Sequence, residues 1–423
     1  MKEEIKINEV IICTIVILVL IIVFEIFLAP RISIRTDFIS KTVSKIFVRQ
    51  NISSQRLFIN AWRTAKNNYA DSSMNHQNWN RWRTKYLKHI KTAADADIAI
   101  NTMLLSLNDP YTRFLRSELF AEQQAVMDAK MTGIGIIFNK SGDNIVINQV
   151  LENSPAEEAD IKPGDTIISI DGRKTDAQTA ASLISDIKNG SSKTVEIILK
   201  RNDVIVSKKL KKKEFPVKTM DYKITDDNIG IIKLSSFMGS DAVLNFIDIL
   251  VKTNKTKAVI LDLRNNFGGI AANAFETANY MMDYAEIAGI KSGSGRIYHI
   301  YSADERIFTK KPVIILINRR TASAAEILAG ALKTQENAVL IGENSYGKNS
   351  IQQVIPMHNK SGLIITTDRY ILPDGSDIYN TGLKPDIYLR QLPGFKDMQM
   401  ETALKTARKI TAAENAGKIV NKI

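Results

Sequence analysis

The spacing of apolar positions divides the chain into segments of different kinds. Residues 10–28 are almost wholly apolar, and a run of that length can cross a bilayer as a helix. From residue 31 to about 128, apolar positions recur every three or four residues, which predicts helices. The stretch 107–115 is predicted to end one helix at Pro110 and begin the next. Within this helical region, Trp79 and Trp82 lie three positions apart and are predicted to pack in a core or an interface. The helical spacing is clearest at Ile98, Ile100, Met103, Leu104 and Leu107.

The pattern changes to short apolar strands between residues 129 and 213. Strands are predicted at 133–138, 145–150, 166–170 and 194–199. Ser154-Pro155 predicts a short helix with proline in its first turn, and residues 178–188 have the spacing of an amphipathic helix. This segment is therefore predicted to be a separate β-rich module.

Strands and helices alternate in the largest segment, residues 214–395, and this alternation predicts an α/β sheet. In such sheets, ligand sites gather at the carboxyl ends of the strands, where the loops 264–269 and 318–323 fall. Residues 396–423 are predicted to form an amphipathic helix and a basic tail. The predicted strands are 231–234, 258–263, 313–317 and 339–342, and the predicted helices are 241–252, 271–282 and 324–332.

Residues 1–30, which contain the apolar run 10–28 and its flanks, are predicted to form an uncleaved membrane anchor. The alternative is a secretory signal, but the flank 28–31 lacks a small-x-small cleavage site and the leading residues mix both charges. Positive charge is greater after the run than before it, which taken literally places the large domain in the cytoplasm. Long domains can cross a membrane regardless of such flanking charge.

Composition narrows the chemistry. The 423 residues predict two or three domains, and 44% apolar with 24% charged residues is typical of a folded protein. A net charge of +12 indicates affinity for anionic surfaces such as phospholipid headgroups. Nucleic acid is the alternative anionic partner, but the positive charge is spread along the chain. The one dense basic run, 208–213, is better explained as a solvated strand end. No nucleic-acid partner is therefore expected.

Cysteine and histidine usage excludes several kinds of site. The single cysteine, Cys13, lies in the apolar run, which excludes a disulfide framework, a cysteine zinc site and a cysteine nucleophile in the soluble part. None of the four histidines has metal-ligand spacing, so no metal is expected. A Ser–His–Asp triad remains open because its members meet only in space, although no histidine lies near Ser323 or Gly268.

A serine and a lysine, Ser323 and Lys348, are the candidate reacting groups. On position alone, Ser323 would be a helix N-cap and Lys348 an exposed loop residue. The paired glycines Gly268-Gly269, however, end a buried strand and can point backbone N–H groups into a cavity. Such donors, with the N–H of the residue after a nucleophile, make an oxyanion hole. A serine–lysine hydrolase would need these parts, with the lysine pKa lowered by burial.

Taken together, these segments resemble the C-terminal processing peptidases, or tail-specific proteases, a serine–lysine family whose members carry a PDZ domain. The matching segments are 321–327, 346–348, 109–114 and 382–386, and the 25-residue spacing of serine and lysine agrees. The resemblance assigns Ser323 as nucleophile, Lys348 as general base and Gln352 as the residue that positions the lysine. It assigns the oxyanion donors to Gly269 and Ala324. The departures from the family pattern are Phe267, Thr321, Ala325 and Asn349.

The β-rich module resembles a PDZ domain, most recognisably over residues 154–172. The resemblance assigns carboxylate capture to the loop Gly133, Ile134, Gly135 and Ile136, with the bound peptide adding as a strand. Asp160 stands where related peptidases usually have glycine. A bulged strand is the alternative explanation of the loop's glycines.

The resemblance implies a multidomain fold with a crotonase-like α/β protease core, and a membrane-anchored serine endopeptidase that cleaves proteins near their C-termini without metal or other cofactor. It implies a bacterial inner-membrane protein, single-pass, with an extracytoplasmic (periplasmic) catalytic domain, against the flanking-charge count. An oligomer or an activating adaptor protein is compatible with it. Two alternatives are a crotonase-type acyl-transfer enzyme and a catalytically silent membrane adaptor that binds tails through its PDZ module.

Overall fold

The computed structural model describes residues 54–141, 144–175, 182, 187, 192–292, 296–304, 310–357, 359–392 and 395–415. The predicted anchor at 10–28 lies outside these residues, as does nearly all of the predicted helix at 178–188. Among the described helices, none combines the length and apolar character that a membrane span requires.

The N-terminal part is helical and has its own hydrophobic core. Trp62 and Trp79 lock two of its segments together, because each indole N–H donates to the other residue's carbonyl at 3.0 and 3.1 Å. The predicted packing of Trp79 and Trp82 is confirmed, since both are buried; the helical spacing fails at Ile98, which is 64% exposed. The helices are α3 (Ser54–Asn68), α4 (Asn80–Tyr86), the 3-10 turn η2 (Leu87–His89), α5 (Ala93–Leu105) and α6 (Ser117–Met127).

The segment 107–115 does more than separate two helices. After α5 the chain turns at Asp109, whose carboxylate accepts the Tyr111 N–H at 3.0 Å and the Thr112 hydroxyl at 2.6 Å. The chain then enters a short strand, β1 (Arg113–Leu115), which pairs antiparallel with β18 (Gly362–Ile371). The predicted break between two helices is confirmed, but the next helix does not begin here, because the carboxylate stabilises a turn that sends the chain into a sheet before α6.

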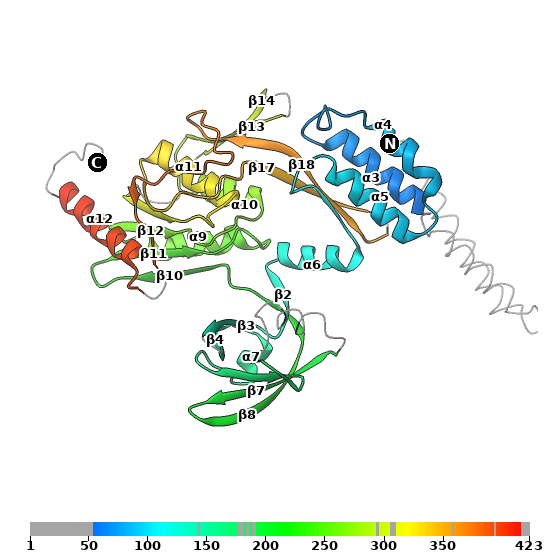
Figure 1. Cartoon of the computed structure of the whole chain (residues 1–423). Coiled ribbons are helices and arrows are strands. Elements are labelled where there is room, and N and C mark those ends of the chain that lie inside the picture. The colour runs from blue at the N-terminus through cyan, green and yellow to red at the C-terminus, as the bar shows by residue number, and fades with distance from the viewer. Residues whose placement is uncertain are drawn as a thin grey trace, which may run out of the picture. The chain divides into compact units, whose positions relative to one another are not determined.

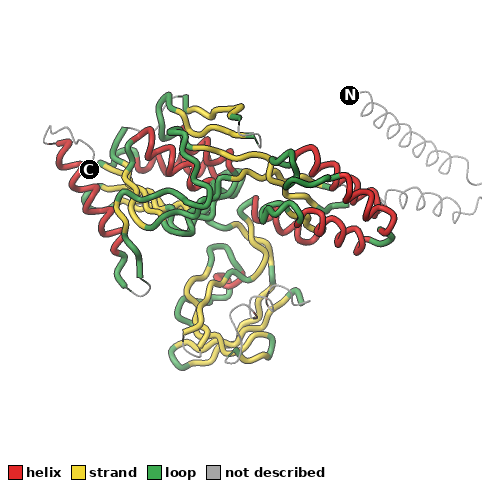
Figure 2. Tube along the Cα trace, turned by 45° about the horizontal axis from the view of Figure 1, so that its top comes forward, coloured by secondary structure: helices red, strands yellow, loops and turns green. Residues whose placement is uncertain are grey.

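The β-rich module forms a sheet in the order β3-β4-β5-β7-β8, with β6 beside β5, and its strands are seen around one short helix in Figure 2. Strand β3 pairs only with β4, which leaves one of its edges open within the described residues. Asp160 has φ +58°, a left-handed conformation that explains why glycine suits this position. The elements are β2 (Lys130–Gly133), β3 (Ile136–Ser141), β4 (Asn144–Val150), α7 (Pro155–Glu158), β5 (Thr166–Ile170), β6 (Arg173–Lys174), β7 (Thr194–Arg201), β8 (Val204–Lys211) and β9 (Lys213–Pro216), the last pairing with β2.

A six-stranded sheet in the order β10-β11-β12-β15-β16-β19 forms the centre of the largest part and is parallel except at β10. Successive residues of its strands face opposite sides: Leu261 packs toward α9, α10 and α11, whereas Ile260 packs toward α12. Figure 1 shows these helices on the two faces. The elements are β10 (Met220–Ile224), β11 (Ile229–Leu234), α9 (Ala242–Thr253), β12 (Ala258–Asp262), α10 (Ala271–Asn279), β15 (Val313–Ile317), α11 (Ala324–Glu336), β16 (Val339–Gly342), β19 (Ile387–Tyr388) and α12 (Met398–Asn415).

A second, antiparallel sheet was not predicted. It contains β1, β13 (Glu286–Lys291), β14 (Ile297–Ser302), β17 (Ser350–Pro356) and β18. Strand β18 belongs to two cores, because Leu363 and Ile365 pack with the N-terminal helices while Tyr370 packs with the central core. Since β17 begins two residues after Lys348 and pairs along β18, both cores hold the lysine segment in place.

Candidate active site

Ser323 ends the turn after β15 and begins α11, as the sequence predicts. Its backbone has φ 55° and ψ −119°, a conformation that L residues rarely adopt and that costs on the order of 1–3 kcal/mol. Hydrogen bonds on both sides maintain it: the Ala322 N–H donates to the Asn266 carbonyl at 2.9 Å, and the Ser323 N–H donates to Glu326 Oε2 at 2.8 Å. A strained residue between a strand and a helix presents its side chain clear of both elements.

Glu326 connects the serine and lysine segments. Its carboxylate has no exposed surface and accepts four hydrogen bonds, two on each oxygen. Besides Ser323, the donors are the backbone N–H groups of Gly347 and Lys348, at 2.7 and 2.9 Å, and the hydroxyl of Ser345. Burial raises the pKa of the Glu326 carboxyl, although the hydrogen bonds oppose that rise. The buried carboxylate therefore fixes the main chain at both candidate reacting residues.

Tyr370 forms a second link between the same two segments. Its hydroxyl lies 3.3 Å from the Ser323 carbonyl oxygen and 3.0 Å from the Lys348 carbonyl oxygen. Tyr370 is almost fully buried in the central core, so its packing there fixes the position of the hydroxyl that joins the two segments.

The Lys348 amine lies in a partly buried, polar pocket. Nζ donates to Gln352 Oε1 at 2.6 Å and to the Ser350 carbonyl at 2.9 Å, and it lies 4.7 Å from the centre of the Tyr111 ring. Burial lowers the pKa of the amine from 10.5 to about 8, although Asp109 and Glu326 act to raise it. A lysine with this pKa can act as a base near neutral pH.

The orientation of Gln352 is fixed by its own amide. Its Nε2 donates to the Ser350 hydroxyl at 2.9 Å and to the Thr366 hydroxyl at 3.1 Å, and its Oε1 faces the lysine. A neutral amine has two N–H donors and one lone pair. Because two acceptors already engage the Lys348 donors, the lone pair stays available for a proton. The side chains of Ser323 and Lys348, both among the described residues, form no direct hydrogen bond. In enzymes, the hydrogen bond between a nucleophile and its base often forms only when substrate binds.

Two backbone N–H groups are open beside Ser323. Neither the Gly269 N–H nor the Ala324 N–H has an acceptor among the described residues. The glycine loop is held by buried Asn266, whose Oδ1 accepts the Gly268 N–H at 2.8 Å and whose Nδ2 donates to the Leu234 carbonyl at 2.8 Å. The phenylalanine that departs from the family pattern, Phe267, is 67% exposed and does not fill this loop.

Gly268 is needed for a steric reason. A Cβ at this position would lie 2.7 Å from the Ala322 carbonyl oxygen and 2.9 Å from Ser323 Cβ. Its φ of +95° also favours glycine. The close approach places the loop directly against the candidate nucleophile.

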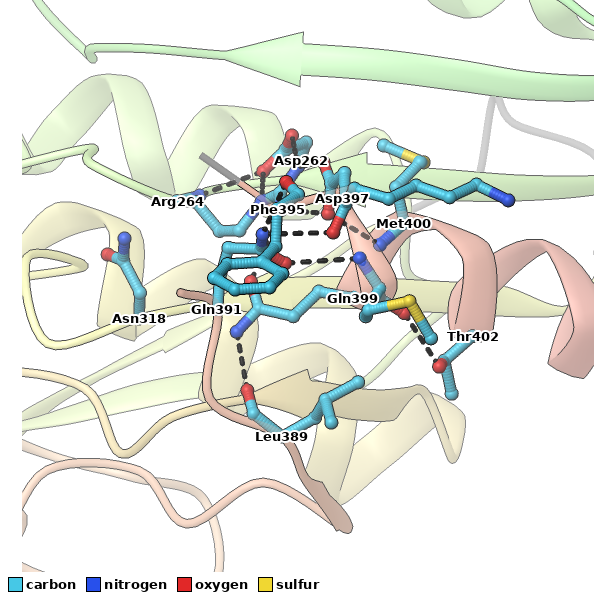
Figure 3. Close-up of polar contacts among 12 residues, drawn as sticks. Asp262, Arg264, Asn318, Leu389, Gln391, Phe395, Asp397, Gln399, Met400 and Thr402 are labelled. Carbon is cyan, nitrogen blue, oxygen red and sulfur yellow. Dashed lines mark hydrogen bonds and ion pairs between the residues drawn. The ribbon is translucent and has the colours of Figure 1, made fainter. Parts of the chain in front are cut away.

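An arginine–carboxylate cluster supports the same strand end (Figure 3). Arg264 forms bidentate contacts with Asp262 on its own strand end and with Asp397 at the start of α12, all between 2.7 and 2.9 Å. It also donates to Gln399 Oε1 at 3.2 Å, and Gln399 in turn donates to the Leu389 carbonyl. The C-terminal helix is thereby fixed to the strand end from which the glycine loop begins.

The segment 109–114 forms a wall of the lysine pocket, which sequence reasoning missed. Besides the Tyr111 ring, Thr112 contributes by accepting the Thr366 N–H at 3.0 Å, across 254 residues of chain. Glu326 was missed as well. Its only signal was the spacing Ser323-x-x-Glu326, which is ordinarily typical of a surface capping pattern.

The four residues proposed to capture a carboxylate span the junction of β2 and β3, from Gly133, which ends β2, to Ile136. Ile134 is buried, and its carbonyl accepts the Ala156 N–H at 2.9 Å. Gly135 has φ +78°, and a Cβ there would lie 2.1 Å from Ser154 Cβ. Ile136 begins β3, the strand whose second edge is open, so the loop lies where an added peptide strand would end.

Comparison with known proteins identifies the family. The model of peptidase family S41 matches residues 228–389, that of the PDZ domain matches 132–211, and that of the tricorn protease C1 domain matches 54–97. The carboxyl-terminal-processing protease of Picosynechococcus sp. is 34% identical over 363 residues, which cover 83% of this chain and 87% of the relative. This chain belongs to the C-terminal processing peptidases. As a member of that family it is a serine-type endopeptidase with a PDZ domain.

Other similar proteins support the same family assignment. The carboxy-terminal processing protease CtpA of Bacillus subtilis is 32% identical over 73% of this chain and 67% of its own length. Among solved structures, the photosystem II D1 C-terminal processing protease is 28% identical, with a TM-score of 0.57 over 84% of this chain and 97% of that one. A structure titled as an S41 protease from Bacteroides fragilis shares the fold at a TM-score of 0.55, with 16% identity over 83% of this chain and 97% of that one.

Proposed function

We propose that this peptidase cleaves proteins near their C-termini through Ser323 as nucleophile and Lys348 as general base. The observation that carries the proposal is the lysine pocket: burial lowers the pKa of the amine to about 8, and its donors are engaged while its lone pair is not. The buried Glu326 carboxylate ties that lysine to the serine. An arrangement in which a buried amine and a strained serine share one anchor is hard to explain as ordinary packing.

The chemistry follows from these positions. Neutral Lys348 accepts the Ser323 proton as Oγ forms a bond to the scissile carbonyl carbon, and the oxyanion is stabilised by the N–H groups of Gly269 and Ala324. The lysine then gives the proton to the leaving amine as the C–N bond breaks. Water hydrolyses the acyl-enzyme with the same lysine as base. Gln352 positions the amine without adding a charge that would raise the lysine pKa.

Active-site labelling tests the nucleophile. Wild-type protein and a Ser323→Ala variant are treated with a fluorophosphonate that reacts with activated serines, and the labelled peptide is identified by mass spectrometry. We expect one label on the tryptic peptide containing Ser323 and none on the variant. Equal labelling of both proteins rejects Ser323 as nucleophile, and an unlabelled wild type favours the silent adaptor.

We propose that the PDZ domain presents substrate tails to this site. The open edge of β3 supports strand addition, and the glycine-containing loop before it supports capture of the terminal carboxylate by Gly133, Ile134, Gly135 and Ile136. A peptide ending in a free carboxylate should be cleaved faster than the same peptide ending in an amide. Deleting residues 131–213 should abolish that difference; unchanged cleavage of both peptides would refute the role.

We propose further that residues 10–28 anchor the enzyme in the bacterial inner membrane with the peptidase outside the cytoplasm. The support is the length and apolar character of this run in the sequence. In intact spheroplasts that express the chain, added protease should digest the catalytic part. Protection in intact spheroplasts, with digestion only after lysis, would place that part in the cytoplasm.

A further inference from the structure

The N-terminal helices carry a concentration of positive charge that catalysis does not use. Between residues 54 and 92 the sequence has one acidic residue, Asp71, and eight basic ones, all exposed. The basic residues are Arg56, Arg63, Lys66, Arg81, Arg83, Lys85, Lys88 and Lys91. We call Lys66, Arg81, Arg83, Lys85 and Lys88 the basic patch.

The contacts of the basic patch show that its charges lie close together. Lys66 and Arg83 both lie over the Trp62 ring, at 5.3 and 5.7 Å from its centre. Arg81 and Lys85 both lie near the Trp82 ring, at 5.2 and 5.9 Å. Two cations that share one ring repel each other, although each is attracted to the ring.

Carboxylates do not neutralise this surface. Among the described residues, none of the five patch cations forms an ion pair with an aspartate or glutamate. Elsewhere in the same structure, exposed lysines and arginines commonly do, as Lys252 does with Asp248. A surface that keeps like charges together without counter-charges binds polyanions.

The basic patch borders an open groove of about 520 Å³. Arg83 and Lys88 contribute two cations to it and Asn80 an amide, and no carboxylate lines it. Arginine, lysine and asparagine side chains that line one hollow carry the guanidinium, ammonium and amide donors that bind the oxygens of a phosphate group. The groove shares no lining residue with the Ser323 site. It is lined by Gln55, Asn80, Arg83, Thr84, Leu87 and Lys88.

We propose that the basic patch binds the headgroup surface of an anionic phospholipid bilayer, with the groove receiving one headgroup phosphate. The state of the aromatic rings favours a bilayer over a nucleic acid. Trp62 and Trp82 are only 7% and 8% exposed, and cations lie over them, so neither ring is free to stack on a base. A lipid surface requires only cations and phosphate contacts.

The position of the basic patch in the sequence also supports binding to a phospholipid bilayer. The helix α3 begins at Ser54, only 26 residues after the apolar run 10–28 ends. A basic segment close to an apolar run is placed to meet the headgroups beside it. Bilayer contact at the patch does not depend on the serine–lysine chemistry, and it would fix how the enzyme is oriented on the membrane.

Lysine footprinting on the full chain tests the proposal. The protein is incubated with vesicles of phosphatidylcholine alone, or with 30% phosphatidylglycerol, and briefly acetylated; mass spectrometry then measures acetylation at each lysine. We expect Lys66, Lys85 and Lys88 to be protected only by the anionic vesicles, and the protection to be lost in 0.5 M salt. Lys255 and Lys257, exposed in the loop after α9, serve as internal references and should react equally with both vesicles.

Two variants sharpen the result. A cation near an anionic surface contributes about fivefold to the contact, so Arg81→Gln with Arg83→Gln should weaken the contact between the basic patch and the anionic surface about 30-fold and restore lysine acetylation. Lys209→Gln with Lys211→Gln removes the same charge from exposed positions in β8 and should leave the footprint unchanged. Equal acetylation with both vesicles overturns the proposal, as does protection by a single-stranded oligonucleotide that anionic vesicles do not reproduce.

Discussion

The substitution Gln352→Glu tests the lysine mechanism through its pH dependence. It places a carboxylate where an amide oxygen now lies 2.6 Å from the Lys348 amine. An opposite charge at this distance shifts a pKa by about 1–3 toward the charged form. The pKa of Lys348, which burial lowers to about 8, should therefore rise to about 10.

The size of the effect follows from the neutral fraction of the amine. With a pKa of about 8, roughly a tenth of Lys348 is neutral at pH 7; with a pKa of about 10, only about a thousandth is neutral. Since only the neutral amine accepts the Ser323 proton, kcat/KM at pH 7 should fall about 100-fold. At pH 10 the deficit should shrink to about twofold, because the wild-type amine is then almost fully neutral and the variant's amine about half neutral.

The assay is cleavage of a fluorogenic tailed peptide, with kcat/KM measured between pH 6 and 10.5. The matched control is Gln353→Glu, which adds the same charge one residue along β17, at an exposed position on the opposite face of the strand. The control should keep the wild-type profile. If Gln352→Glu loses activity equally at every pH, the lysine is not the titrating base and the reasoning fails.

Three further predictions concern the supports of the site. Because Ser323 has φ 55°, Ser323→Gly should be more stable than Ser323→Ala by about 1 kcal/mol in urea unfolding, although both lack activity; equal stabilities would contradict the strain. Asp397→Asn should lower kcat about tenfold with little change in KM, because it loosens Arg264, which supports the strand end before the glycine loop. Glu401→Gln on the same helix removes only surface ion pairs and should leave kcat unchanged. Equal kcat values for the two variants would show that Arg264 does not support the glycine loop in this way. In the PDZ domain, Gly135→Ala should be strongly destabilising, because residue 135 has a positive φ and its new Cβ would overlap the buried Ser154. Gly133→Ala should be tolerated, because its new Cβ would meet nothing within 4 Å. Thermal unfolding of both variants checks this, and similar melting temperatures would show that the loop relaxes.

The parallel sheet was predictable because its strands are buried on both faces. Strands such as Ala258–Asp262 and Val313–Ile317 are therefore continuous apolar runs, each followed by a polar loop. The rule that loops at the carboxyl ends of such strands form sites then predicted that the glycine loop and Ser323 lie close together, and the structure places Gly268 against Ser323. The candidate serine, glycine pair and lysine could all be named from local patterns.

The parts that the sequence did not reveal depend on contacts between distant residues. Strand β18 was missed because its residues pack in two different cores, so no single pattern runs along it. Thr112 bonds to Thr366 across 254 residues, and nothing local indicates that pairing. Glu326 has the spacing of an exposed helix cap, and only the fold shows that it is buried beneath both reacting segments.

The most direct measurement is the pKa of the Lys348 amine itself. Protein labelled with ¹³C at the lysine ε-carbons can be titrated by NMR, with the Lys348 signal identified by its absence from a Lys348→Arg variant. The account predicts that this signal titrates at about 8, well below the ordinary lysine value of 10.5. A Lys348 signal that titrates near the ordinary value of 10.5 would leave the amine charged at neutral pH, and Ser323 would then have no base.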